Sequence, residues 1–542
     1  MKRQSCLGLL SLMFASRALG ADPFAAPPAP SDSFVASSVR YLDGALLRDH
    51  GHQADRDRWL GNSRPTPPVP PQADDATFLR RACIDLAGRL PAAEEVRAFL
   101  ASTAADKRSQ ATEALLREPG AAEVRFRLLA EAFRVTDQSA GIDWLRKAAA
   151  DDMPLDEMVK AMMMAEKGTP PARLLEREGD DPFRTACALA ETLLGQSLCC
   201  AMCHDHPFST PTQMQCYQFA ACFGPQKLPA RYLYRDGRPG AKVQPRPLPE
   251  PGASYPPGTL EGGPFSRQAR AQLAEALAGT SAKRFGLVTA LRVWRGLFGT
   301  PGAHAHESSG AVEVLPAWSE QLPPHFERSG TSCFAQPLAS QPWTDNSFDG
   351  NNSCESVRAL EEVFQHCHYR MGDLQRILAR TEAYGRECME VENSPSAAWL
   401  PAAPQVRRLP AEVIWDALVS RLPPGQSPWR VSALSAQVPE ASHPLRLLGR
   451  GRREWPDEST RAVSFDLARF MMNGPVVDQA AQASGGLPAH VNLDDLVLSI
   501  LGRPPTENER AAARRHLGES PVNGAGDLAW ALLNTREFMF ER

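Results

Sequence analysis

The distribution of proline most constrains how this chain can fold. Its 48 prolines are clustered, with one group in residues 22–31, a second in 64–71 and ten more from residue 225 to residue 264. Proline lacks a backbone N–H, and its ring clashes with the preceding helical turn, so such segments cannot form continuous helices. We therefore expect ordered bodies separated by extended, proline-rich connectors.

Between these segments, apolar residues recur with the period of an amphipathic α-helix. Asp74 or Asp75 can cap the first such helix of the longer ordered part. In that helix Phe78, Ala82 and Leu86 fall on one face. Similar patterns occur near residues 91–100, 111–116, 126–133, 144–149, 156–165, 183–198, 265–299, 355–381, 409–421, 462–472, 492–501, 506–517 and 528–533. Because strand patterns are sparse, the sequence predicts a mainly α fold.

The proline-rich segments divide the sequence into two predicted helical domains. Residues 74–224 form the first and residues 265–542 the second, with 225–264 as the connector between them. Residues 21–73 are expected to be a proline-rich linker with a short helix. Within the connector, residues 232–237 (Tyr-Leu-Tyr-Arg-Asp-Gly) are typical of a small strand and turn. A chain of 542 residues is long enough for two domains.

The N-terminus is typical of a secretory signal peptide. Lys2 and Arg3 form a basic start, residues 7–15 are apolar, and the segment ends in small residues that mark a cleavage site. No later stretch reaches the length of a transmembrane helix. We therefore expect residues 1–20 to be removed, leaving a periplasmic or secreted protein with no membrane span. Disulfides and covalent haem attachment are both permitted in that environment.

One pentapeptide, residues 200–204, carries the most specific chemical signal. It reads Cys-Ala-Met-Cys-His, the C-x-x-C-H spacing that attaches haem c. The thiols of Cys200 and Cys203 can form thioether bonds to the two vinyl groups of one porphyrin. The imidazole of His204, directly after the second thiol, can then bind the iron. Since Cys and His each occupy 12 of 542 positions, only about 0.006 such matches are expected in a shuffled chain.

The second axial ligand would decide what such a haem does. A Met or a second His makes a six-coordinate electron carrier, whereas an open position permits small-ligand or peroxide chemistry. The sequence does not identify this ligand, and the candidates are Met214, His206, His304 and His306. Because His206 lies only two residues after His204, we expect it and Asp205 to orient the loop or contact a propionate.

The same region also permits a tetrahedral zinc site, since thiolate and imidazole are the ligands that structural zinc prefers. The zinc set would comprise Cys200, Cys203, His206 and one of Cys216 or Cys222. A further alternative is a structural block of core or disulfide-bonded cysteines beside a histidine. No βαβ pattern surrounds the motif, which disfavours a thioredoxin-like Cys-x-x-Cys site.

Other clusters of polar residues are interpreted as ordinary structure. His366, Cys367 and His368 point in different directions if they lie on one helix, so they would not converge on a metal. The carboxylate pairs at 94–95 and 361–362 are typical of helix first turns or solvated faces. No common hydrolase or phosphate-loop motif occurs, so no catalytic residue is assigned. With a net charge of −4 and no basic stripe, nucleic acid is not an expected partner.

Several blocks of residues resemble two families that occur together in secreted proteins of planctomycetes and verrucomicrobia. The first is DUF1549, or PSCyt2, which residues 78–88, 90–96, 143–144, 153–156, 200–208 and 219–223 resemble. The second is DUF1553, or PSD1, which residues 256–263, 294–299, 407–412 and 530–538 resemble. The resemblance implies a secreted, cytochrome-like protein, but no established biochemical role.

Three classes of function follow from these observations. The first is an exported c-type cytochrome-like protein that binds haem c covalently and serves electron transfer or redox sensing with an unknown redox partner. The second is a secreted metal-dependent enzyme linked to polysaccharide breakdown, working beside other polysaccharide-processing proteins. The third is a helical scaffold in which residues 200–208, here called the Cys-His block, form a structural zinc or disulfide site. Detecting covalent haem or bound zinc in the purified protein would separate them.

Overall fold

The computed structural model describes most of the chain from residue 30 to residue 541. The described residues are 30–60, 66–133, 135, 141–176, 182–195, 198, 200–202, 205, 212–224, 244–248, 267–279, 283–299, 354–389, 400–422, 443–450, 465–485, 493–519 and 524–541. Within these ranges the fold is mainly α, as predicted, with one two-stranded sheet. No helix in the described ranges is both long and apolar enough to cross a bilayer.

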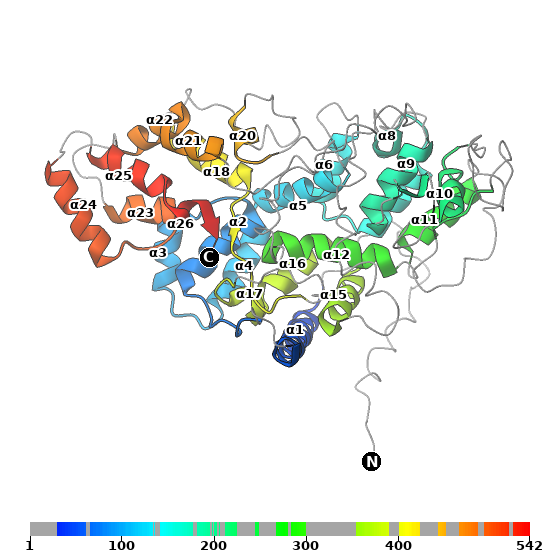
Figure 1. Cartoon of the computed structure of the whole chain (residues 1–542), viewed down its shortest axis with the longest axis horizontal. Coiled ribbons are helices and arrows are strands. Elements are labelled where there is room, and N and C mark those ends of the chain that lie inside the picture. Colours follow the sequence, from blue (N-terminus) through cyan, green and yellow to red (C-terminus); the bar gives the residue numbers. More distant parts are fainter. Residues whose placement is uncertain are drawn as a thin grey trace, which may run out of the picture.

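A large first core contains residues from both sides of the proline-rich connector (Figure 1). Its helices are α1 (Asp32–Leu60), α2 (Asp75–Ala87), α3 (Ala93–Ala101), α4 (Lys107–Leu116), α5 (Pro119–Ala132), α6 (Ile142–Ala150), α7 (Leu155–Met164), α8 (Pro170–Glu176), α9 (Pro182–Leu189), α10 (Gln213–Ala220), α11 (Arg267–Ala278), α12 (Lys283–Phe298), α15 (Glu355–His366), α16 (Met371–Ala379) and α17 (Glu382–Gly385). How the chain divides into independently folding units stays a prediction.

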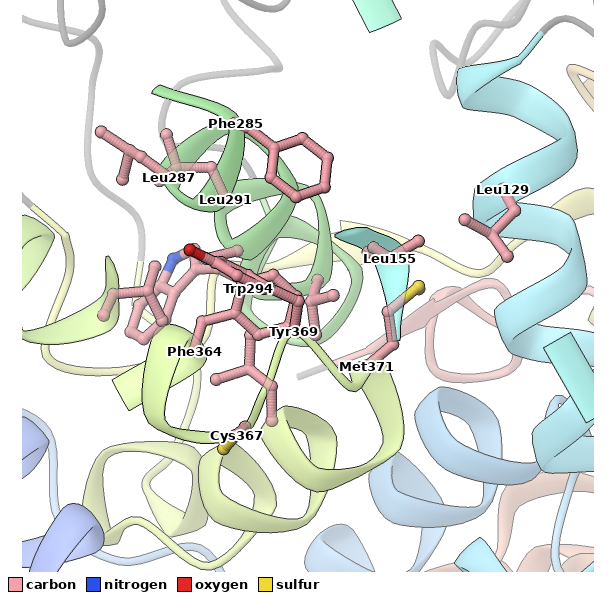
Figure 2. Close-up of a cluster of buried hydrophobic side chains, with 14 of the residues drawn as sticks. Leu129, Leu155, Phe285, Leu287, Leu291, Trp294, Phe364, Cys367, Tyr369 and Met371 are labelled. Carbon is pink, nitrogen blue, oxygen red and sulfur yellow. The ribbon is translucent and has the colours of Figure 1, made fainter. Parts of the chain in front are cut away.

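Helix α12 lies in the middle of this first core. Figure 2 shows its Phe285, Leu291 and Trp294 among side chains that come from α5, α7 and the α15–α16 corner. Trp294 is fully buried and stacks on Phe298 with ring centroids 3.7 Å apart. A helix that is apolar on most sides is stabilised by burial rather than by its own propensity. Helix α12, which follows the connector, is therefore an integral part of the body that precedes it.

A second, smaller core lies at the end of the molecule that contains the C-terminal helices (Figure 1). Its helices are α18 (Ala411–Val419), α20 (Pro444–Leu447), α21 (Phe465–Asn473), α22 (Pro475–Gly485), α23 (Leu493–Leu501), α25 (Gly524–Leu533) and α26 (Arg536–Met539), and α24 (Glu507–Glu519) lies outside it against α25. The antiparallel sheet pairs β1 (Arg407–Arg408) with β2 (Phe540–Glu541). It thereby joins the start of this body to the last described residues of the chain.

A buried ionic cluster connects that sheet to helix α2. Arg407 of β1 binds both Asp85 of α2, at 2.5 Å, and Glu541 of β2, at 2.7 Å. The Tyr384 hydroxyl donates to the second oxygen of Asp85 at 2.9 Å. Arg81, one helical turn before Asp85, donates to the Tyr384 carbonyl oxygen at 2.7 Å. All five side chains are buried, so the two carboxylates depend on these partners in place of water.

Helix α1 is longer than the short helix expected for residues 21–73, with 29 residues. Val35, Leu42 and Leu46 form its buried stripe. Its carboxylates cap two helices that lie more than 300 residues later: Asp49 accepts hydrogen bonds from the backbone N–H groups of Glu355 and Ser356, and Asp43 does so for residues 382 and 383. The helix is therefore held by distant partners that no local pattern reveals.

We expect Asp49→Ala to lower the free energy of unfolding by about 1–2 kcal/mol, the usual cost of losing a helix cap. Asp49 Oδ2 accepts from the Ser356 N–H at 2.7 Å and from its hydroxyl at 2.6 Å, and both bonds would be lost. Urea-induced unfolding measures the change. Asp55→Ala is the matched control, since Asp55 lies on the same helix in an exposed pair with Arg58. Equal losses in the two variants would contradict the capping role.

The structure refines two further expectations. The predicted helix at 355–381 is two helices, because His368 and Tyr369 adopt left-handed backbone with φ of 51° and 56° and turn the chain between α15 and α16. The small strand expected at 232–237 lies outside the described residues. The observed sheet was not predicted, since two-residue strands carry no alternating pattern.

Candidate functional site

The segment that leads into the Cys-His block ends earlier than the sequence predicts. Helix α9 continues as a π-helix, η2 (Ala190–Leu194), and stops at Gly195, which has a φ of 58°. A left-handed residue ends a helix, and glycine adopts that conformation without steric cost. Single π-helical turns occur frequently next to functional sites. The helix expected over 183–198 therefore ends before the cysteine motif.

Two arginines of helix α12 hold this helix end. Arg284 Nε donates to the Leu194 carbonyl oxygen at 2.6 Å. Arg292 Nη2 donates to the Glu191 carbonyl oxygen at 3.0 Å, and its Nη1 donates to that of Thr192. The last carbonyl groups of a helix have no partners within the helix, so these bonds satisfy them. A helix from beyond the connector thus fixes the point at which the Cys-His loop begins.

The described part of the block itself is one short 3-10 turn, η3 (Cys200–Met202). The Met202 N–H donates to the Leu198 carbonyl oxygen at 3.1 Å, and Ala201 is fully buried. Cys203, His204 and His206 lie outside the described residues, as does the side chain of Cys200. The predicted haem ligands and the first three members of the zinc set therefore stay predictions.

Helix α10 fastens the block from the other side. Gln213, its first residue, donates its backbone N–H to Asp205 Oδ1 at 2.7 Å and its side-chain Nε2 to the Met202 carbonyl oxygen at 3.1 Å. The Tyr217 hydroxyl donates to the same Met202 oxygen at 3.2 Å. Asp205 was expected to orient the loop, and its carboxylate does accept at the start of α10. The residues on each side of Cys203 and His204 are thus both bound to Gln213.

The start of α10 is well defined by its own sequence. Thr212 accepts from the Gln215 N–H, and the Gln215 side chain accepts from the Thr212 N–H, which is a complete capping box. This reciprocal pair holds the first turn that presents Gln213 to the block. The capping pattern could have located α10 from the sequence, but it does not indicate the contacts of Gln213.

The two further cysteines of the predicted zinc set differ in their surroundings. The Cys216 thiol is fully buried and lies 4.0 Å from the Leu198 carbonyl oxygen, directly before the block. The Cys222 thiol donates to the Gln218 carbonyl oxygen of its own helix at 3.6 Å. Burial raises the pKa of Cys222 to about 12, so this thiol is protonated at neutral pH. Of the two, Cys216 is the better candidate ligand, because its thiol lies beside Leu198, directly before the block.

Met214 is the one candidate second ligand that the structure describes. It packs in a small apolar cluster with Tyr217, Ala221 and Phe183. The rings of Phe183 and Tyr217 meet edge to face with centroids 4.7 Å apart. Since Tyr217 also binds the Met202 carbonyl oxygen, Met214 lies in the same neighbourhood as the block. The other candidates, His206, His304 and His306, lie outside the described residues.

The structure also describes two of the remaining polar clusters. Helix α15 ends at His366 and His368 adopts left-handed backbone, so residues 366–368 do not lie on one helix as was expected. His366 and His368 are exposed while Cys367 between them is buried, so the three do not converge. Glu94 and Glu95 lie in the first turn of α3, where Glu95 binds Arg89 at 2.8 Å. Throughout the described ranges, no three His, Cys, Asp or Glu side chains gather as a metal-binding group.

Comparison with known proteins supports one part of the resemblance. Residues 64–227 match the family model PSCyt2, described as a protein of unknown function (DUF1549). That segment contains α9, the Cys-His block and α10. Neither the curated proteins nor the solved structures include a match to this chain. The similarity to DUF1549 is therefore confirmed for the first predicted domain, and the similarity to DUF1553 stays a prediction.

Proposed function

We propose that this chain is an exported c-type cytochrome-like protein in which Cys200 and Cys203 bind one haem covalently and His204 is an axial ligand. The observation that carries the proposal is the C-x-x-C-H pentapeptide within the segment that matches PSCyt2. The expected signal peptide at residues 1–20 supports it, since haem c is attached outside the cytoplasm.

The surroundings of the motif support this proposal. A 3-10 turn begins at Cys200 and ends at Met202. The two cysteines are three positions apart in the sequence, which is the spacing that two thioether bonds to one porphyrin need. Hydrogen bonds to Met202 and Asp205 hold the turn and the residue after His204. The donor set, two thiols and an imidazole, is the one that haem c requires.

Bound haem would supply one-electron redox chemistry. The chain's own contribution is to orient the axial imidazole and to control access to the opposite face of the ring. Met214, which packs against Tyr217, is the candidate second ligand among the described residues. Ligation by Met214 favours electron transfer with a redox partner, whereas an open position favours sensing of a small ligand.

The test is the mass of the mature protein made in a host that attaches haem c. Denaturing mass spectrometry should show the mass of one haem added per chain. Cys200→Ala and Cys203→Ala should each weaken attachment, whereas His204→Ala should retain the haem but change the spin state of its iron. Cys222→Ala is the matched control, because that thiol donates to its own helix and should not affect loading. Wild-type protein without added haem mass would refute the proposal.

A zinc site is the second candidate, and the position of Cys216 favours it. That thiol lies beside Leu198, so a thiolate ligand from α10 can reach the region of the block. The protein would then be a secreted metal-dependent enzyme linked to polysaccharide breakdown, or a scaffold stabilised by the metal. Metal analysis distinguishes this alternative: one zinc per chain, lost in Cys216→Ser, supports it.

A further inference from the structure

Arg407 is shared by two carboxyl groups that come from different parts of the fold. Its guanidinium lies 2.5 Å from Asp85 Oδ1 of α2 and 2.7 Å from Glu541 Oε2 of β2. Asp85 is 7% exposed and Glu541 is 3% exposed, so water screens little of the repulsion between them. Once both carboxyl groups are charged, they therefore compete for one arginine.

The surroundings favour Asp85 in this competition. Asp85 also accepts from the Tyr384 hydroxyl at 2.9 Å. Glu541 has a second oxygen, Oε1, which is buried and has no hydrogen-bond partner among the described residues. A buried acceptor without a donor lowers stability, so Glu541 has more to gain from reaching water. The other groups whose charges act on one or both of these carboxyls are Arg80 and Arg81 of α2 and Cys388 after α17.

The three elements of this cluster differ in how firmly they are held. Helix α2 has 13 residues, and its Arg80 donates to the carbonyl oxygens of residues 500, 537 and 538. Arg407 of β1 also donates to the carbonyl oxygens of Arg295 and Gly296 in α12. Strand β2 is only two residues long, and it is held by β1 and by the side chain of Glu541. Of the three, β2 is therefore the element that separates at the lowest cost.

We propose that β2, together with the Glu541 side chain, is a proton-controlled latch. While Asp85 is protonated, Arg407 pairs with Glu541 and β2 stays on β1. When Asp85 ionises, it attracts Arg407 more strongly and repels Glu541, so β2 separates from β1 while both cores stay folded. The carboxylate of Glu541 then reaches water. This device does not depend on haem binding.

The pKa of Asp85 sets the pH range in which the latch opens. Burial raises this pKa from 3.8 to about 8, and the charge of Glu541 contributes to the rise. Departure of Glu541 therefore lowers the pKa of Asp85, and by linkage the ionisation of Asp85 favours that departure. If the pKa falls by about one on opening, ionisation makes opening about tenfold more favourable.

Hydrogen exchange of the full-length protein tests the latch without any substitution. Short labelling pulses followed by mass spectrometry should show that the amides of residues 407–408 and 540–541 lose protection about tenfold between about pH 6 and about pH 9, after correction for the intrinsic exchange rate. The amides of α12 should keep their protection, because that helix lies in the middle of the first core. Protection at the sheet that is independent of pH, or a parallel loss in α12, would overturn the proposal.

Three variants assign the effect to the two carboxyl groups. Asp85→Asn and Glu541→Gln each remove one of the competing charges, so the sheet should stay protected up to about pH 9 in both. Asp494→Asn is the matched control, since that carboxylate pairs with Arg510 at the surface, and it should open like the wild type. An unchanged pH response in Asp85→Asn would show that another group controls the separation.

Discussion

Replacing Arg407 with methionine is expected to lower the free energy of unfolding by about 3–5 kcal/mol, the usual cost of leaving a buried charge without its partner. Arg407 binds Asp85 and Glu541, and it also donates to the Gly296 carbonyl oxygen at 2.5 Å. Methionine fills much of the volume but pairs with none of these groups. Urea-induced unfolding at a pH above about 8, where the Asp85 carboxyl of the wild type is ionised, measures the full effect.

Two further variants make this result specific to the charge. Arg510→Met removes an arginine that pairs with Asp494 at the surface, and it should change stability little because solvent screens that pair. Adding Asp85→Asn and Glu541→Gln to Arg407→Met should recover part of the loss, since neutral amides tolerate burial better than carboxylates. If the triple variant is no more stable than Arg407→Met, the loss comes from packing and not from unpaired charge.

The same cluster should make stability depend on pH through Asp85. Burial raises the pKa of Asp85 from 3.8 to about 8. The positive charge of Arg407 lowers this pKa, but the negative charge of Glu541 raises it again. The folded protein therefore holds this proton more tightly than the unfolded chain. The stability that the folded protein gains from binding this proton is complete below about pH 4 and is lost as the pH rises through 8. The free energy of unfolding then falls by at most about 1.4 kcal/mol per pH unit.

Asp85→Asn isolates that contribution. Burial also raises the pKa values of Asp43, Asp156 and Asp373, so the wild-type curve contains several titrations. These three aspartates titrate in both proteins, so their effects cancel in the difference in urea midpoint between the wild type and Asp85→Asn. We expect that difference to shift steadily in favour of the variant between about pH 4 and pH 8. A difference that is independent of pH would show that Asp85 remains ionised throughout that range.

Many individual helices could be predicted from the sequence, because their signals are local. Asp74 caps α2 by accepting from the Thr77 N–H, and Thr506 with Glu509 forms the predicted capping box of α24. Buried methionines fill the apolar face of α7. These features depend on residues within one or two turns of each other, so the pattern of polar and apolar residues is sufficient.

The candidate site could be predicted only in part. The C-x-x-C-H spacing identifies Cys200, Cys203 and His204 as candidate haem-binding residues from the sequence alone. The sequence does not indicate that Gln213 binds residues on both sides of the motif, or that Arg284 and Arg292 hold the helix before it. Glutamine and arginine are common surface residues, and only their burial in the folded chain shows what they contact.

The sequence by itself therefore determined the helical character of the chain and the location of its most specific motif, because both depend only on the spacing of residues that are close together in the sequence. Tertiary structure decided which distant segments meet. Helix α1 caps helices more than 300 residues later in the chain, and β1 pairs with β2 at the last described residues of the chain. Such contacts arise because buried carboxylates and backbone groups must find partners once water is excluded. The partners come from distant parts of the chain, so they produce no repeating pattern of residues that could be recognised in the sequence.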